Sequence, residues 1–345
     1  MTIKDLAAQT GYSVGTVSRV LNNQPHVSDL AREIILKAAE ESGFQLNENA
    51  RQLKQQQSNS LLVVCKGRSN ELFDALLLAI QSRVADTQYT LIVDYIDESA
   101  DEVRRALQLC REKKPQGILF LGGNQDHFQE SFHQISVPCV LVTSSAADLS
   151  FENLSSVTSD DALAAAMAIE GLLELGHENV VVIGGHRTYS DITRLRYEGC
   201  IRAFREKGIS FREEQYETAR FTFEEGYRAA KALLERNPHF TALFAMSDVM
   251  ALGAIRALTD AGKRVPEDVS VIGFDGLQIG EYTLPRLSTV AQSVEQLARR
   301  SMDRLLSAIE QTAQASHEIV PVRLLLRESV RKHHPASESY KSAVR

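Results

Sequence analysis

The segment that decides the fold of the N-terminal region reads GYSVGTVSRVLN and spans residues 11–22. Ser13 is a residue type that caps helices, because its side-chain oxygen can accept a hydrogen bond from a free backbone N–H group. Apolar side chains follow at the i, i+3, i+4 spacing of one buried helix stripe, namely Val17, Val20 and Leu21. The segment therefore predicts an amphipathic helix directly after Ser13, over residues 14–21.

Helices are also predicted on both sides of this segment. Thr2 and Asp5 form a variant of the capping box, and Gly11 is suited to end a helix of about two turns over residues 3–10. Ser28 can cap a third helix that ends at Gly43, and its expected inward residues are Ile34, Ile35, Ala38 and Ala39. Three such short helices bury little apolar surface, so the unit is marginally stable alone.

The polar face of the second helix carries small residues and one cation. Gly15, Thr16, Ser18 and Arg19 lie opposite the buried stripe, with Val14 at the leading turn. Small side chains and an arginine near a helix N-terminus suit insertion into the major groove of DNA. Helix-turn-helix patterns also occur by chance, so a small helical cap without a ligand stays open at this point.

Length and composition describe an ordinary globular chain. The 345 residues exceed one typical core, and 43% are hydrophobic and 24% charged. No apolar run is long enough for a membrane span, and the charged N-terminus argues against a secretory signal. The four cysteines show neither disulfide nor zinc spacing, which favours reduced thiols in the cytoplasm.

The distribution of charge gives no support to DNA binding by itself. The net charge is -7, whereas residues 1–57 hold six Lys or Arg and six Asp or Glu and are therefore neutral. The remaining residues carry the whole negative charge. Binding to DNA must therefore be argued from the helix-turn-helix motif.

Residues 2–7 (TIKDLA), residues 11–22 and Val27-Ser28 resemble the headpiece of the LacI/GalR (lactose/galactose repressor) family. The resemblance implies that Arg19 binds a guanine bidentately and that Val14 contacts a thymine methyl group. Gly15 replaces a polar residue that the family often has, so the base preference at that step stays open. By the same resemblance, the residues near phosphates or groove edges are Ser13, Thr16, Ser18, Asn22, His26 and Ser28.

Residues 47–53 (NENARQL) resemble the hinge helix of the same family, although Leu46 stands where the family usually has a proline. The resemblance implies that Leu53 is a wedge in the minor groove, with Ala50 and Arg51 beside it on the DNA. A helix this short does not persist alone in water, so DNA and a second hinge helix must stabilise it. A polar interdomain linker is the alternative.

From Ser60 onward, short apolar runs alternate with amphipathic stretches, which predicts parallel sheets covered by helices on both faces. The expected strands are 61–65, 90–95, 117–121, 137–142, 180–183, 242–246 and 269–274. The expected helices include 75–84, 162–175, 196–204, 251–261 and 294–308. The length suits two doubly wound lobes with a ligand between the carboxyl ends of their strands.

The expected fold class is therefore α/β, with an N-terminal three-helix helix-turn-helix headpiece and a two-lobed periplasmic-binding-protein-like domain with parallel sheets. The expected domains are a headpiece (1–46), a hinge helix and linker (47–59), an effector-binding and dimerisation domain (60–330), and a disordered tail (331–345). Following the resemblance, lobe 1 comprises about residues 60–160 and 291–320. Lobe 2 comprises about residues 161–290 and 321–330.

Candidate effector-binding residues follow the predicted strands, where Asp and Arg can bind vicinal hydroxyl groups and an aromatic ring can stack on a sugar. They are Asn70, Phe73, Arg196 at the start of a helix, Phe221, Asp248 and Asp275. The resemblance supports Arg196, Phe221, Asp248 and Asp275 in particular. The structural alternatives are a helix cap for Asp248, a turn for Asp275 and core packing for Phe221.

Cationic side chains near the same mouth raise the question of the ligand's charge. Lys66 and Arg68 follow the first strand, and Arg187 and Arg196 can face them from the second lobe. An anionic ligand such as a sugar phosphate is one interpretation. Solvated rim residues are the favoured alternative for Lys66 and Arg68.

The sequence offers little support for an enzyme, because it lacks a nucleophile elbow, a phosphate loop and a dinucleotide-binding fingerprint. No metal or other cofactor is expected, and His333-His334 has no partner at metal-ligand spacing. The resulting hypothesis is a cytoplasmic homodimeric transcriptional regulator, expected to be a repressor. It binds double-stranded operator DNA under the control of a small carbohydrate-like effector, a sugar or sugar phosphate. A cytoplasmic sugar- or purine-binding protein without a DNA role is the alternative.

Overall fold

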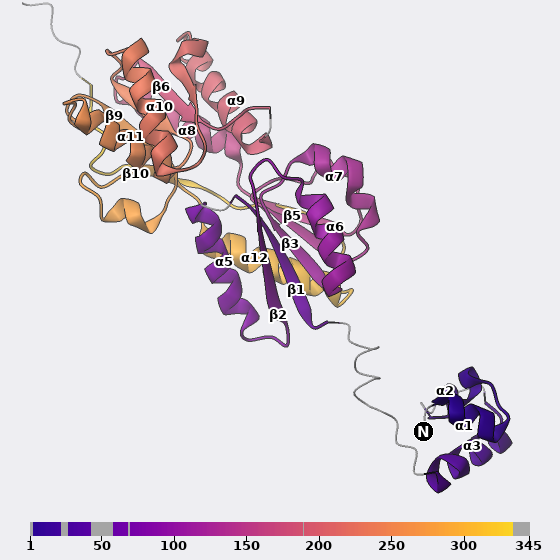
Figure 1. Ribbon diagram of the computed structural model, residues 1–345. Coiled ribbons are helices and arrows are strands. Elements are labelled where there is room, and N and C mark those ends of the chain that lie inside the picture. The colour runs from indigo at the N-terminus through magenta and orange to yellow at the C-terminus, as the bar shows by residue number, and fades with distance from the viewer. Residues whose placement is uncertain (1–2, 22–26, 43–57, 68–69, 189, 334–345) are drawn as a thin grey trace, which may run out of the picture. The chain divides into compact units, whose positions relative to one another are not determined.

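In a computed structural model the chain forms two compact units, residues 1–57 and residues 58–345. The structure describes residues 3–21, 27–42, 58–67, 70–188 and 190–333 (Figure 1). Within these ranges, no helix combines the length and the apolar character that crossing a membrane requires.

The first unit contains the three predicted helices, α1 (Ile3–Thr10), α2 (Val14–Leu21) and α3 (Asp29–Glu41). The first two have the predicted bounds. The Ser13 hydroxyl accepts the Thr16 N–H at 3.2 Å, and the Ser28 hydroxyl accepts the Ala31 N–H at 3.3 Å, so both predicted caps are confirmed. The buried core consists of Leu6, Ala7, Val17, Val20, Ile35 and Ala39.

One predicted core residue of the first unit is exposed. Ile34 is 40% accessible, whereas Ile35 is fully buried. Successive residues on a helix point about 100° apart, and on α3 it is Ile35 that points to the core while Ile34 points away from it. Ile35 packs with Ala39, one turn further along α3.

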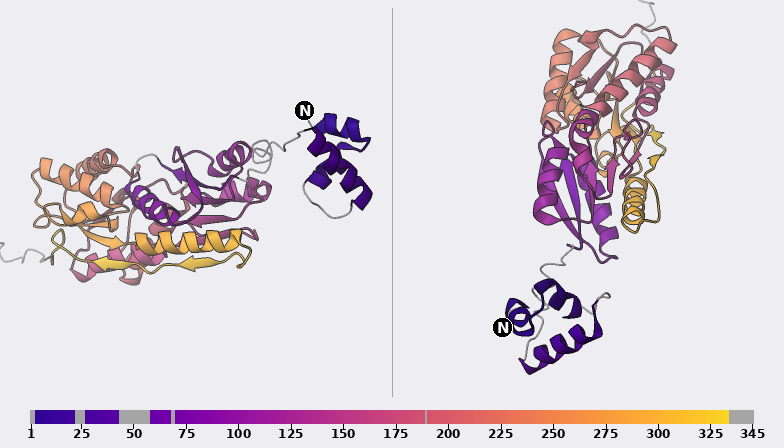
Figure 2. Two further views of the ribbon diagram at one scale, coloured as in Figure 1. Left: turned by 90° about the horizontal axis from the view of Figure 1, so that it is seen from below. Right: turned by 90° about the vertical axis from the view of Figure 1, so that its right-hand side faces the viewer.

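The second unit begins with lobe 1, which is built on a parallel sheet in the order β11-β5-β4-β3-β1-β2. The strands are β1 (Ser60–Lys66), β2 (Thr90–Ile96), β3 (Gly117–Leu121), β4 (Cys139–Val142), β5 (Leu154–Thr158) and β11 (His317–Ile319). The helices are α5 (Glu71–Val84), α6 (Glu102–Lys113), α7 (Gln125–Ser131) and α12 (Val294–Ile309). The sheet is covered on both faces, with α5 and α12 on one side and α6 and α7 on the other (Figures 1 and 2).

Lobe 2 repeats this plan in the order β12-β10-β9-β8-β6-β7, with only β12 antiparallel to its neighbour. Its strands are β6 (Val180–Gly184), β7 (Tyr216–Thr218), β8 (Ala242–Ala245), β9 (Ser270–Asp275), β10 (Ser288–Ala291) and β12 (Arg323–Leu325). Its helices are α8 (Asp161–Glu174), α9 (Asp191–Glu206), α10 (Phe223–Arg236) and α11 (Asp248–Asp260). A single apolar core joins both faces of this sheet.

The chain crosses between the two sheets three times, after β5, after β10 and after β11. In each lobe the strand order reverses beside the first strand, between β1 and β3 and between β6 and β8. Ligands bind outside the carboxyl ends of strands at such reversals. A ligand-binding site is therefore expected at the loops that follow these four strands.

Two glycines of lobe 2 lie at close contacts between elements. In the pair α10–α11, a Cβ atom on Gly253 would overlap the carbonyl oxygen of Phe223. A Cβ atom on Gly171, in α8, would instead lie 2.8 Å from Cδ2 of Leu324, the far end of a flexible side chain. The two glycines thus differ in whether rigid backbone or a movable side chain fills the space beside them.

We therefore expect Gly253→Ala to lower the free energy of unfolding by about 1–3 kcal/mol, because α10 and α11 must move apart. Gly171→Ala is the matched control and should cost less: both alanines gain about 1 kcal/mol of helix propensity, but at Gly171 only the end of the Leu324 side chain has to shift. Urea unfolding followed by circular dichroism measures both. An equal loss for the two variants would contradict this account of the α10–α11 contact.

Candidate functional site

A cavity of about 380 Å³ lies between the two lobes, at the strand ends that the topology indicates. Lobe 1 lines it with residues that end or follow β1, β2, β3 and β4, including Lys66, Asn70, Phe73, Gly122 and Thr143. Lobe 2 lines it with residues that end or follow β6, β7 and β9, including His186, Ser190, Phe221 and Asp275. Its size is that of a small-molecule site.

The lobe 1 wall combines an aromatic ring with polar groups. Asn70 caps α5, since its Oδ1 accepts the backbone N–H of Leu72 at 3.1 Å and of Phe73 at 3.4 Å. The Phe73 ring lies so close to Gly122 that a Cβ atom there would come within 3.0 Å of it. Asn70 and Phe73 therefore both lie where they were predicted, at the cavity.

Thr143 is a cavity residue that the sequence analysis did not name. It follows β4, has a φ of 71°, and its buried hydroxyl has no hydrogen-bond partner among the described residues. A buried hydroxyl without a partner is costly, and a ligand in the cavity can satisfy it. The signal was available, because Thr143 directly follows an expected strand.

Arg196 lies in the second turn of α9, not at a helix start as predicted. The helix begins earlier, at Asp191, because the Ser190 hydroxyl accepts the Thr193 N–H at 3.3 Å. The Arg196 guanidinium is almost completely buried and lies 3.6 Å above the Phe274 ring. It donates from Nε to Asp161 at 2.8 Å and from Nη1 to the Met246 carbonyl at 2.6 Å, while still lining the cavity.

Asp275 ends β9 and lines the cavity with a φ of 112°. Gln292 donates a hydrogen bond of 3.0 Å to its Oδ1. Burial raises the pKa of Asp275 to about 8, against the opposing charge of Arg196. The carboxyl group can therefore both donate and accept hydrogen bonds near neutral pH, which suits recognition of hydroxyl groups.

Phe221 lies in the loop after β7 and lines the same cavity as Arg196 and Asp275. A Cβ atom on Gly185 would lie 2.8 Å from the Phe221 ring, so the glycine leaves room for that ring. The core alternative for Phe221 applies in part, since its ring packs on the lobe 2 core while one side stays accessible.

Asp248 does not line the cavity. It is fully buried as the first residue of α11, and its Oδ2 accepts the Leu277 N–H at 2.6 Å. The helix cap is its neighbour Ser247, whose hydroxyl accepts the Met250 N–H at 3.2 Å. Asp248 thus holds the turn after Asp275, and the structure places it behind the site.

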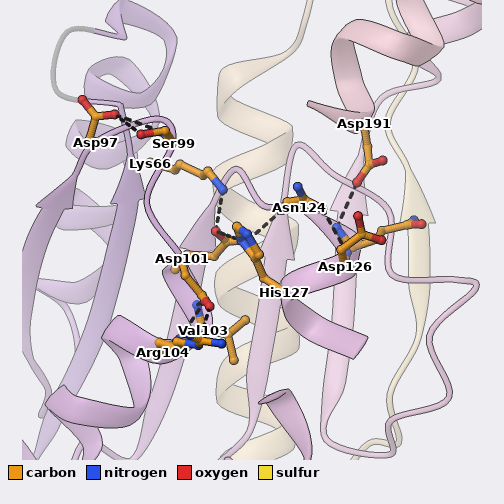
Figure 3. Close-up of polar contacts among 12 residues, drawn as sticks. Lys66, Asp97, Ser99, Asp101, Val103, Arg104, Asn124, Asp126, His127 and Asp191 are labelled. Atoms are coloured by element: carbon orange, nitrogen blue, oxygen red, sulfur yellow. Dashed lines mark hydrogen bonds and ion pairs between the residues drawn. The ribbon is translucent and has the colours of Figure 1, made fainter. Parts of the chain in front are cut away.

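The cations predicted near the cavity are paired with carboxylates or lie elsewhere. Lys66 contacts Glu102 at 2.5 Å (Figure 3). Arg187 pairs with Glu213 and stacks on the Tyr197 ring, outside the cavity lining. Arg68 lies outside the described residues. The rim also carries Arg220, which the sequence analysis missed and which reaches across to Glu98 of lobe 1 at 2.5 Å.

In the first unit, α2 presents the residues predicted to contact DNA. Ser13, Gly15 and Arg19 are exposed, and so is Ser28 before α3. Thr16 is half-buried, with its hydroxyl 2.9 Å from that of Ser13. Val14 and Ser18 lie on α2, but their side chains are outside the described part of the chain, as are Asn22, His26, Ala50, Arg51 and Leu53.

The start of the predicted disordered tail packs on lobe 2. The His333 N–H donates to the Leu175 carbonyl at 2.7 Å, and the His333 ring stacks on His177 with 5.3 Å between centroids. Order therefore extends to residue 333, while residues 334–345 lie outside the described ranges.

A helix-turn-helix unit followed by a two-lobed cleft domain defines a regulator that combines DNA binding with small-molecule binding. Residues 2–47 match the family model for bacterial regulatory proteins of the lacI family, and residues 169–330 match the periplasmic binding protein-like domain. The chain is 33% identical over 332 residues to the transcriptional regulator MalR of Clostridium butyricum, covering 95% of this chain and 99% of MalR. It therefore belongs to the lacI family and is a DNA-binding transcriptional regulator.

Solved structures of lacI-family regulators are similar to this chain over both of its units or over the two-lobed domain. The Lac repressor dimer bound to operator and the anti-inducer ONPF has a TM-score of 0.71 and 26% identity, covering 96% of this chain and 99% of that one. The LacI family regulator from Enterococcus faecium with bound ribose has a TM-score of 0.69 and 25% identity, covering 80% of this chain and 100% of that one.

The buried Asp248 makes a prediction about pH. Burial raises the pKa of Asp248 from 3.8 to about 7, so the native state keeps a proton that the unfolded chain releases. Between those values the native state binds more protons, and the free energy of unfolding falls as pH rises. In Asp248→Asn, the decrease in the free energy of unfolding between pH 5 and pH 7 should be smaller than in the wild type by about 1–2 kcal/mol.

Urea unfolding at a series of pH values gives the two slopes. Asp260→Asn, at the more exposed end of the same helix, is the control and should keep the wild-type slope. Identical slopes for Asp248→Asn and the wild type would show that Asp248 does not hold a proton in the native state.

Proposed function

We propose that the cavity between the lobes binds a small carbohydrate and that this binding sets the affinity of the headpiece for operator DNA. The observation that carries the proposal is the convergence of two aromatic rings with Arg196 and Asp275 at the reversal of strand order in both lobes. Structural relatives of this chain include a CelR–cellobiose complex and a regulator with bound ribose.

The proposed contacts follow from the chemistry of the lining. Phe73 and Phe221 offer flat apolar faces to the C–H surface of a sugar ring. Arg196 has Nη2 left after its two buried hydrogen bonds, and Asp275 and Thr143 add groups that bind hydroxyls. Asp248 acts indirectly, by holding the turn that positions Asp275.

For DNA recognition we propose the exposed face of α2, with Arg19 on a guanine and Val14 on a thymine methyl group. Ser13, Gly15, Thr16, Ser18 and Ser28, with Asn22 and His26, border the groove. Ala50, Arg51 and Leu53 form the hinge contact. We keep residues 1–46, 47–59 and 60–330 as the proposed domains.

We further propose a cytoplasmic homodimer that acts as a repressor by binding and not by catalysis. Two headpieces are needed to read two half-sites of a near-palindromic operator. Large apolar side chains are exposed on both lobes, such as Leu78 on α5 (66%) and Leu284 of lobe 2 (92%), as expected of surfaces that a second copy covers. A change of lobe angle then alters the spacing of the two hinges, with a typical coupling of about 1–3 kcal/mol.

Arg19→Ala should reduce discrimination between operator and scrambled duplex by about 1–3 kcal/mol, because a bidentate arginine reads one base pair. Lys37→Ala, an exposed cation on α3, is the control and should weaken both duplexes alike. Operator sequences selected from random duplexes, followed by binding titrations at fixed salt, provide the measurement. Unchanged discrimination in Arg19→Ala refutes the assigned role.

Phe221→Ala should weaken effector binding at least about tenfold, since it removes an aromatic face from the cavity. Calorimetry of the full-length protein with ribose, maltose and cellobiose identifies the effector, and operator titrations report its consequence. Phe223→Ala, two residues further along and outside the cavity lining, should leave effector affinity unchanged. Equal effects of the two substitutions would count against the cavity as the effector site.

A further inference from the structure

The cavity lining carries three cations whose charges are already balanced. Arg196 is paired with Asp161 at 2.8 Å, Arg220 with Glu98 at 2.5 Å, and Lys66 with Glu102 at 2.5 Å. Two further acidic side chains line the cavity: Asp97, which also contacts Arg220 at 3.4 Å, and Asp275, whose raised pKa of about 8 keeps it mostly protonated at neutral pH. Among the described residues, the cavity therefore presents no excess of positive charge.

Lys66 is paired with Glu102, which does not itself line the cavity and which accepts hydrogen bonds from further groups as well. Glu102, the first residue of α6, is fully buried. Its Oε2 accepts from Lys66 Nζ and lies 2.9 Å from His127 Nδ1, and its Oε1 accepts the Asn124 N–H at 2.6 Å. The end of β1 and the start of α7 thus supply three donors to one carboxylate.

These donors keep Glu102 in its charged form. Burial alone raises the pKa of Glu102, but the hydrogen bond from His127 and the charge of Lys66 outweigh burial and hold it below the usual value. The same contact raises the pKa of His127. At neutral pH a buried negative charge therefore lies against Lys66, the lysine among the described residues of the cavity lining, and offsets its charge.

The helices that begin at the cavity also offer little attraction to an anion. α5, α9 and α10 start there, and each has acidic residues in its first turn, such as Glu71, Asp191 and Glu224. A helix N-terminus attracts anions, but a carboxylate in the first turn already uses that field. These starts are also capped by side chains of lining residues, Asn70, Ser190 and Thr222.

We infer that the effector is an uncharged polyhydroxyl compound, and that Glu102 determines this specificity by neutralising Lys66. The inference rests on the proposed function, since it names the ligand class of the same cavity. A phosphate or carboxylate group entering the cavity would meet cations that are already paired, together with the carboxylates of Asp97 and Glu98, so it would lose hydration without gaining a counter-charge. Hydroxyl groups need only the hydrogen-bonding groups that the lining provides.

The first test uses inorganic phosphate with the full-length protein, so that no sugar need be known. Calorimetry at constant ionic strength should show no saturable phosphate binding to the wild type. Glu102→Gln leaves Lys66 uncompensated and should bind phosphate at least about tenfold more tightly than the wild type. Adding Lys66→Met to that variant should abolish the gain.

Glu130→Gln is the matched control, because it removes the same charge from α7, where Glu130 contacts Arg104 and not Lys66. It should behave as the wild type. Saturable phosphate binding by the wild type overturns the inference, and so does a folded Glu102→Gln that gains none. Should Glu102→Gln fail to fold, the wild-type measurement and the paired sugars below still decide.

The second test compares ribose with ribose 5-phosphate, and maltose and cellobiose with their 6′-phosphates. We expect a neutral member of one pair to bind and change operator affinity, and its phosphate to bind at least about tenfold more weakly. If a phosphorylated sugar binds more tightly and changes operator affinity, the charge inference fails while the proposed function stands. If no sugar of either kind acts, the proposed function fails, and the phosphate titration alone decides the inference.

Discussion

One buried guanidinium holds together the part of lobe 2 on which the site depends. Arg196 joins α9 to Asp161 at the start of α8, to the Met246 carbonyl after β8 and to the Phe274 ring in β9. A buried charge is tolerated only when its partners are in place, and losing one partner is far more costly than the pair is worth. The ends of these four elements must therefore converge, and their convergence forms the floor of the cavity.

The second constraint is the parallel order of both sheets, which brings the carboxyl ends of neighbouring strands to one edge. The loops must then turn sharply, and unusual backbone conformations gather there. Gly122, Thr143 and Asp275 all line the cavity with positive φ angles, although two of them are not glycine. Such conformations persist where the surroundings enforce them, and they concentrate at binding sites. Thus the fold that creates the cleft also fixes the directions of its polar groups.

Local patterns were sufficient for much of this structure. Helix caps and apolar runs predicted α1, α2 and most strands. The rule that ligands bind at the carboxyl ends of parallel strands predicted Phe73, Phe221 and Asp275 at the cavity.

The strand β5 was missed because its sequence, LSSVT, is largely polar, although it is buried between two other strands. Asp248 was misplaced because its direction depends on Leu277, in a distant loop. The partner of Lys66 was missed for the same reason, since Glu102 lies beyond β2 in the chain. Long-range pairing of this kind leaves no local signal.

The two ion pairs at the cavity differ in a way that separates selectivity from switching. Lys66 and Glu102 belong to the same lobe, and their side chains are at most 10% exposed, so their pairing does not depend on the angle between the lobes. Arg220 and Glu98 belong to different lobes and are 53% and 40% exposed. An exposed pair is worth about 0–1 kcal/mol and is screened by salt. It can therefore break and re-form as the lobes move without dominating their equilibrium. Under the proposed function, the charge balance inside lobe 1 selects the ligand, and the weak ion pair across the cleft allows the bound ligand to set the angle between the lobes.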